Sequence, residues 1–113
     1  MKRDIELIRK ILREVEKKQE PKGWINPEVD GYSEVEVSYH IKLLAEAGYL
    51  EAEDLSTKNS FEWVAKGLTP EGHHFLEGME NATLWSKMKK HFGSGIKTVS
   101  LELIKIYLTR DTQ

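Results

Sequence analysis

Apolar residues recur with helical spacing through the first part of the chain, and charged residues fill the positions between them. This pattern predicts an amphipathic helix over residues 3–19. Its apolar stripe consists of Ile5, Ile8, Ile11, Leu12 and Val15. Pro21, Gly23 and Pro27 follow it and end the helical structure.

The stretch over residues 31–50 carries the most complete local signals. Ser33 and Glu36 have the spacing of a capping box, in which each side chain accepts an N–H of the other residue's backbone. Val37, Ile41 and Leu44 then form one buried stripe of a helix. Gly48 supplies a left-handed residue that ends it. We therefore predict a short helix that leads into a strand.

The segment between these two helices has two open interpretations. Residues 24–30 can form a short extended segment, or Asn26-Pro27 can cap a single helical turn. Only 14 residues separate the two predicted helices, which leaves no room for the full supporting helix of an ordinary helix-turn-helix.

The rest of the chain predicts a hairpin followed by helices. Residues 49–54 and 61–67 are expected to be strands joined by a polar turn. Thr69-Pro70 is typical of a helix start, and the face of that helix carries Phe75, Leu76 and Met79. Another helix is expected over 83–92, with Trp85, Met88 and Phe92 on one side. Residues 98–108 also permit a strand, but we favour a helix.

These elements predict an α+β chain: a winged helix-turn-helix-like domain with a reduced second helix and additional C-terminal helices. We expect the winged-helix-like domain over residues 1–80, and a helical extension over 81–113 that packs on the same domain. A chain of 113 residues is long enough for one core.

The composition of the chain excludes cysteine chemistry and gives no sign of a membrane span. The chain has no Cys, which excludes disulfides, thiolate zinc sites and cysteine nucleophiles. No apolar run approaches a membrane span, and the N-terminal segment is a charged helix rather than a signal peptide, so we expect a cytoplasmic protein with no membrane partner. The net charge is −2, but residues 21–82 carry four basic and twelve acidic side chains, whereas residues 83–113 carry six basic and two acidic ones.

Three blocks resemble a known family: MKRDIELIRKIL, GYSEVEVSYHIKLLAEAGYLEA and LTPEGHHFLE. This family contains small bacterial and phage proteins and is known as a domain of unknown function. The resemblance implies a winged-helix-like fold. The resemblance covers roughly residues 1–92 and brings no activity, substrate or catalytic residue. Separately, VSYHIKLLAEAGYLEA is similar to the recognition helix and following strand of winged-helix repressors, and LTPEG to their wing exit.

We expect a regulatory or phage accessory protein, and DNA binding is the first hypothesis for its mechanism. The likeness to repressors implies contacts to double-stranded DNA from Ser38, Tyr39, His40 and Lys42. Positive charge adds further tentative contacts, which are the hairpin residue Lys58 and the basic patch Lys87, Lys89, Lys90 and Lys97. A simpler interpretation makes Tyr39 a half-buried aromatic residue against the hairpin and His40 a hydrogen-bonded surface histidine.

The charges favour an alternative. The predicted recognition helix carries Glu34, Glu36 and Glu46 against a single Lys42, and carboxylates repel the phosphates that normally dominate DNA affinity. The alternative function is a protein–protein interaction module that uses the acidic stretch of residues 28–54 and binds no DNA. The terminal helices could also form a homodimer by analogy with other winged-helix proteins.

Catalysis and metal binding have little support. His73, His74 and Glu77 lie within one helical turn, but no further ligand with zinc-site spacing accompanies them. No nucleophile–base set, phosphate-binding loop or paired-carboxylate signature is present, so we expect no enzyme activity, no cofactor and no metal.

Overall fold

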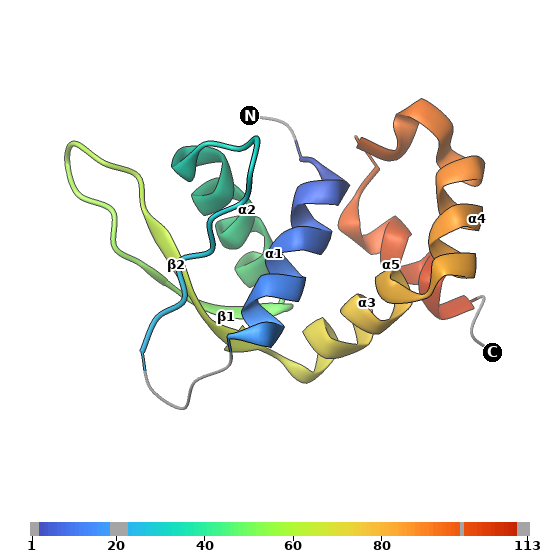
Figure 1. Ribbon diagram of the computed structural model, residues 1–113, viewed down its shortest axis with the longest axis horizontal. Helices are drawn as coiled ribbons and strands as arrows, with labels where there is room; N and C mark the ends of the chain where they lie inside the picture. Colours follow the sequence, from blue (N-terminus) through green and yellow to red (C-terminus); the bar gives the residue numbers. More distant parts are fainter. Residues whose placement is uncertain (1–2, 19–22, 98, 111–113) are drawn as a thin grey trace.

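The structure, a computed structural model, describes residues 3–18, 23–97 and 99–110, with only the backbone of Lys97, Thr109 and Arg110 (Figure 1). It has a mixed α+β architecture, as the sequence predicts. The elements in chain order are α1 (Ile5–Lys17), α2 (Glu34–Glu46), β1 (Leu50–Asp54), β2 (Trp63–Leu68), α3 (Pro70–Glu80), α4 (Ala82–Phe92), a 3-10 helix η1 (Gly93–Lys97), and α5 (Leu101–Arg110).

The first helix lies at the centre of the molecule. All members of the predicted stripe are buried, together with Leu7. The carboxylate of Asp4 accepts the backbone N–H groups of Glu6 and Leu7, so it caps the start of α1. The hairpin lies on one side of α1 and helices α4 and α5 lie on the other (Figure 1).

Helix α2 begins and ends as predicted. Ser33 Oγ accepts the N–H of Glu36 at 3.1 Å, and the Glu36 carboxylate accepts the N–H of Ser33 at 3.1 Å, which completes the capping box. The predicted stripe is buried, and Gly48 has a φ of 86°, a left-handed conformation that glycine adopts without steric cost. The chain then continues directly into β1.

The two strands form an antiparallel hairpin, with Leu50 opposite Leu68 and Asp54 opposite Trp63. Ile25 pairs with Ala65 on the other side of β2, through N···O distances of 2.6 and 2.9 Å. The segment 23–33 is therefore extended where it passes β2, and no helix occurs among those residues. The extended interpretation of residues 24–30 is confirmed, and so is the missing supporting helix within the part described.

The C-terminal helices pack on α1 and α3. Thr69 caps α3 by accepting the N–H of Gly72, with Pro70 in the first turn, as predicted. In α4, two cations lie near the Trp85 ring: Arg9 Cζ is 4.5 Å and Lys89 Nζ is 5.8 Å from its centroid. Residues 101–110 are helical, which confirms the favoured interpretation of the tail.

One hydrophobic core joins the predicted domain 1–80 and the predicted extension 81–113. It contains Ile8 and Met79 from the first part and Met88 and Ile104 from the second. None of the helices in the described ranges is both long and apolar enough to cross a membrane.

Candidate functional site

Two of the predicted contacts on α2 lie inside the fold. Ser38 is 4% exposed and His40 is 1% exposed. Ser38 Oγ accepts a hydrogen bond from the backbone N–H of Trp63 at 3.1 Å, and this bond connects α2 to the start of β2. The prediction that these two side chains face DNA is wrong, and so is the interpretation of His40 as a surface histidine. Helix α2 packs through this side against the hairpin and α1.

The buried His40 is the centre of a partly buried hydrogen-bond network. Its Nε2 accepts the backbone N–H of Asp4 at 2.9 Å, and its Nδ1–H donates to the carbonyl oxygen of Glu36 at 2.7 Å. Tyr32 Oη donates to the Asp4 carboxylate at 2.8 Å. Burial, together with the hydrogen bond and the negative charge of Asp4, raises the pKa of Tyr32 to about 12. The network connects α1, α2 and the segment 23–33.

The predicted contacts that remain near the solvent on this side are few. Tyr39 and Lys42 are half-buried, which agrees with the simpler interpretation of Tyr39, and Lys58 is exposed in the hairpin turn. Hydrogen bonds from Ser56 lower the pKa of Asp54, and the charge of Lys42 contributes a smaller effect in the same direction. Lys42 therefore lies near a carboxylate of the hairpin.

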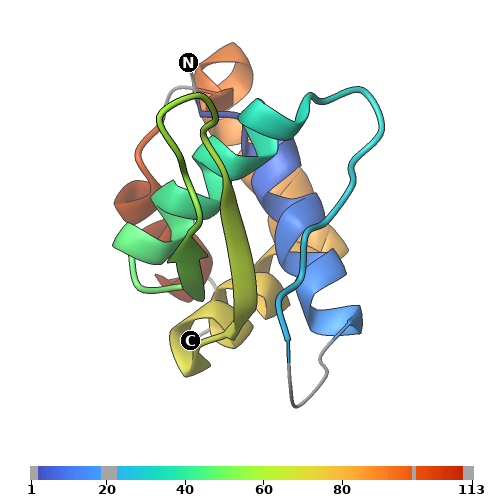
Figure 2. The same ribbon diagram turned by 90° about the vertical axis from the view of Figure 1, so that its left-hand side faces the viewer.

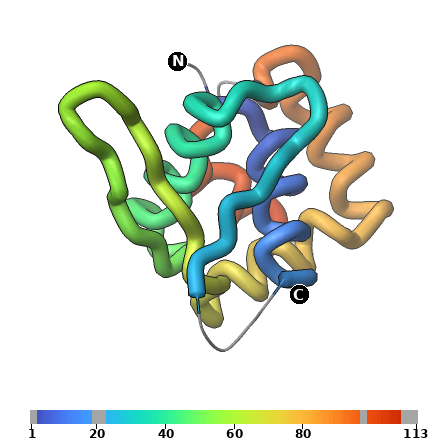
Figure 3. The backbone as a smooth tube through the Cα atoms, turned by 60° about the vertical axis from the view of Figure 1, so that its left-hand side comes forward, coloured from blue at the N-terminus to red at the C-terminus, as the bar shows by residue number. Residues whose placement is uncertain are grey.

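The start of α2 is acidic. Glu28, Asp30 and Glu34 line a hollow of about 250 Å³, whose remaining walls include Pro27 and Val37. The segment 23–33, the start of α2 and the hairpin lie on the same side of the molecule (Figures 2 and 3). We call the three carboxylates and the exposed Val35 beside them the acidic face.

The predicted acidic residues do not all belong to this face. Glu34 is exposed within it, whereas the carboxylate of Glu36 is engaged in the capping box. Glu46 is the last residue of α2, about 18 Å along the helix from Glu34. Both Glu34 and Glu36 lie in the first turn, where the helix dipole favours negative charge.

The predicted basic patch lies on α4, at the opposite end of the molecule from the hairpin (Figure 1). Lys87 and Lys90 are exposed, while Lys89 pairs with Glu6 at 3.3 Å. The side chain of Lys97 lies outside the part that the structure describes. The hairpin and α4 lie at opposite ends of a molecule whose longest dimension is 42 Å (Figure 1), so the structure does not bring Lys58 and the patch on α4 together.

The histidines of α3 point to separate partners. His73 Nδ1 lies 3.6 Å from a carboxylate oxygen of Glu16, whereas His74 Nδ1 lies 4.0 Å from one of Glu77. Within the described residues, no group of three or more His, Asp or Glu side chains could hold a metal ion.

The sequence predicted neither the exposure of Trp24 and Phe61 nor the burial of His40. Trp24 and Phe61 are 57% and 38% exposed, although large aromatic side chains are usually mostly buried. Glu28 and Asp30 belong to the predicted acidic stretch 28–54, but the sequence did not place them in one hollow with Glu34, because that arrangement depends on the path of the segment 23–33 beside β2. A partial signal existed for His40, which lies three residues after Val37 and four before Leu44, within the buried stripe.

Comparison with known proteins gives one family and one relative. Residues 2–100 match the family described as "Hypothetical protein (DUF2513)". A protein of Haemophilus influenzae (strain ATCC 51907 / DSM 11121 / KW20 / Rd), described as "Uncharacterized protein", is 40% identical over 106 residues, which are 93% of this chain and 90% of that relative. No solved structure matches the chain.

Proposed function

The chain belongs to the DUF2513 family of hypothetical proteins, in agreement with the family resemblance in its sequence. Since this family is described without an activity, we propose the function of the chain from the geometry of its surface. The protein is a winged-helix-like, non-enzymatic binding module. It holds a positively charged segment of another protein with the acidic face at the start of α2.

The order of elements supports the winged-helix-like part of the proposal. A central helix, an extended segment, the helix α2 and a hairpin follow one another, and the extended segment pairs with β2. A winged helix has the same order, with one more helix before the recognition helix. In this comparison α2 takes the place of the recognition helix, and the loop of the hairpin takes the place of the wing.

The hollow carries the proposal of a cationic protein partner. DNA-reading helices commonly present their N-terminal residues to the base edges, with cations nearby to meet phosphates. Here Glu28, Asp30 and Glu34 surround that end instead. These three carboxylates can meet the charged head of a lysine or arginine. Val35, 45% exposed, adds apolar contact area beside the hollow.

A peptide-display selection tests this function. A random-sequence peptide library is selected on the wild-type protein, and the enriched peptides are assayed by fluorescence anisotropy. We expect peptides in which a lysine or arginine adjoins apolar residues. The double variant Glu28→Lys/Glu34→Lys should bind them about tenfold more weakly or worse, since like charges then meet across the interface.

The matched control is Glu77→Lys/Glu102→Lys, which makes the same change of charge at exposed positions of α3 and α5. It should retain the affinity. The proposal is wrong if no peptide is enriched, or if both double variants lose affinity equally, since the attraction would then come from net charge rather than from the acidic face.

DNA binding is the second candidate function. It is favoured by Tyr39, Lys42 and Lys58, which retain solvent exposure on α2 and the hairpin. Salt dependence of duplex binding distinguishes it from the first candidate, because phosphate contacts release counterions.

A further inference from the structure

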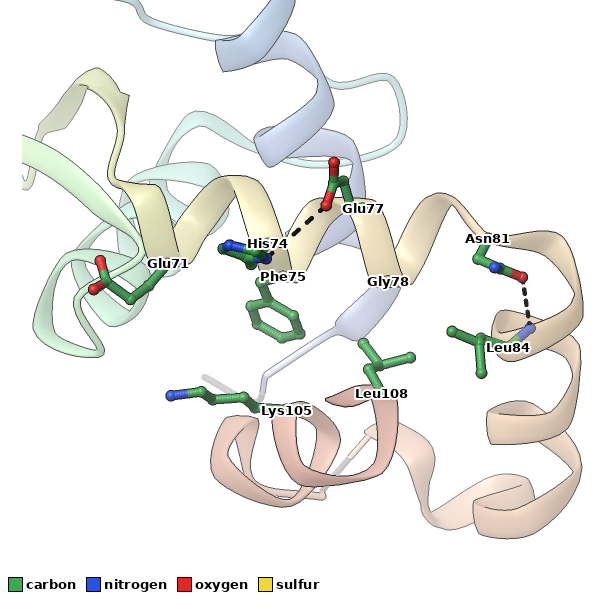
Figure 4. A pocket seen from close by; sticks show the side chains of 9 residues that line it. All are labelled: Glu71, His74, Phe75, Glu77, Gly78, Asn81, Leu84, Lys105 and Leu108. Carbon is green, nitrogen blue, oxygen red and sulfur yellow. Dashed lines mark hydrogen bonds and ion pairs between the residues drawn. The ribbon is translucent and has the colours of Figure 1, made fainter. Parts of the chain in front are cut away.

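A second hollow lies between α3 and α5, away from the acidic face (Figure 4). Its volume is about 580 Å³, within the range of small-molecule sites. The two helices are in close contact at Gly78, where a Cβ atom would lie 3.1 Å from the Cβ of Leu108. Glycine at this position therefore lets α5 pack closely on α3 beside the hollow.

The inner wall of the hollow is apolar. Phe75 from α3, Leu84 from α4 and Leu108 from α5 line it, and each is at most 5% exposed. Asn81 also lines it, but the side-chain oxygen of Asn81 accepts the backbone N–H of Leu84 at 3.1 Å and caps α4. An occupant thus meets mainly apolar surface in the interior, which suits a ring or a branched hydrocarbon group.

The opening carries two opposite charges on facing helices. Glu71 in the first turn of α3 and Lys105 on α5 lie on the same side of the opening (Figure 4). His74 is directed to Glu77 at 4.0 Å, and both side chains are more than four-fifths exposed, so they add little to the interior. A ligand that reaches both Glu71 and Lys105 needs one cationic and one anionic group.

We propose that this hollow binds a small amphipathic zwitterion, with an apolar body against Phe75, Leu84 and Leu108. Its ammonium group lies at Glu71 and its carboxylate at Lys105. This is the chemistry of an apolar amino acid or a close derivative. The inference is independent of the acidic face, because it uses none of the same residues.

Three matched probes test the proposal in the full chain by amide chemical-shift titration in NMR. L-Tryptophan carries both charges, tryptamine lacks the carboxylate, and indole-3-propionate lacks the ammonium group. We expect tryptophan to shift amides of α3 and α5 and to bind more tightly than either control. The difference should be about two- to fivefold for each missing charge, since exposed ion pairs contribute little.

Two exposed-site variants assign each charge. Glu71→Gln should bring the affinities of tryptophan and indole-3-propionate together, and Lys105→Gln should do the same for tryptophan and tryptamine. Lys87→Gln, on the outer face of α4, should leave all three affinities unchanged. The proposal is overturned if no probe shifts amides of α3 and α5, or if a singly charged probe binds the wild type as tightly as tryptophan. It is also overturned if neither variant alters the order of affinities.

Discussion

The backbone N–H of Asp4 donates a hydrogen bond to Nε2 of His40 at 2.9 Å, across 36 positions of the sequence. Because Asp4 is the cap of α1, this N–H has no partner within the helix. Nδ1–H of the same imidazole donates to the carbonyl oxygen of Glu36, so the ring is fixed in one neutral tautomer. His40, which occupies a position of the predicted recognition helix, therefore stabilises the fold by connecting α1 to α2.

His40→Phe should lower the free energy of unfolding by about 1–3 kcal/mol, because the partly buried N–H of Asp4 would be left without its partner. Urea denaturation followed by circular dichroism measures the change. Tyr39→Phe is the control, since the adjacent ring is only half-buried and keeps its shape. Equal stability of His40→Phe and wild type would show that water replaces the imidazole.

Titration of Tyr32 should make the free energy of unfolding fall as the pH rises in the alkaline range. Its pKa is about 12 in the folded chain against 10.0 for the ordinary value, so the folded state keeps the phenolic proton longer than the unfolded state. Between these pH values the unfolded state binds fewer protons, and the free energy of unfolding therefore falls as pH rises. This contribution is fully present below pH 10.0 and is lost as pH approaches 12.

The measurement is the urea midpoint at a series of pH values across that window. Tyr32→Phe should show a shallower decline than wild type, because it has no phenol at this position to titrate. Tyr39→Phe should retain the wild-type slope. An identical slope in all three proteins would mean that the hydrogen bond from Tyr32 to Asp4 does not persist at alkaline pH.

Local signals in the sequence were sufficient for most of the elements. The capping box of Ser33 and Glu36 and the Thr69-Pro70 start depend on residues within one helical turn, and both are present as predicted. The stripe of α1 was also predictable, because helical periodicity alone places its members on one face.

The candidate site was less predictable, because it depends on contacts between distant segments. The burial of Ser38 requires the start of β2 to pack against α2, which places Trp63 beside it. The acidic hollow requires the segment 23–33 to run along β2, so that Glu28 and Asp30 come close to Glu34. No spacing within one segment specifies either arrangement.

Gly72 should be intolerant of substitution although its backbone is ordinary helix. A Cβ atom there would overlap the carbonyl oxygen of Tyr49, which also accepts the N–H of Thr69 at 3.2 Å. Gly72→Ala must push the start of α3 away from Tyr49, and such overpacking costs about 1–3 kcal/mol. Thermal unfolding should show the loss. Gly67→Ala is the control, since open space surrounds that position, and equal melting temperatures would contradict the packing described.

Duplex DNA binding, if it occurs through α2 and the hairpin, should depend only weakly on salt. Lys42 and Lys58 are the lysines predicted as contacts there, and each phosphate neutralised contributes about −0.9 to the slope of log K against log salt, so a slope of about −2 is expected. Lys58→Ala should make the slope less steep by about 0.9, which is the contribution of one neutralised phosphate. Lys87→Ala/Lys90→Ala should leave it unchanged, because α4 lies at the other end of the molecule.

Fluorescence anisotropy with a labelled duplex, repeated over a range of salt concentrations, measures the slope. A slope steeper than about −4 would require cations beyond these two lysines and would make the α4 patch part of the interface. No binding at low salt would remove DNA from the candidate partners. The carboxylates of Glu28, Asp30 and Glu34 would then be the main charged groups left at the start of α2, and they select for a partner of positive charge.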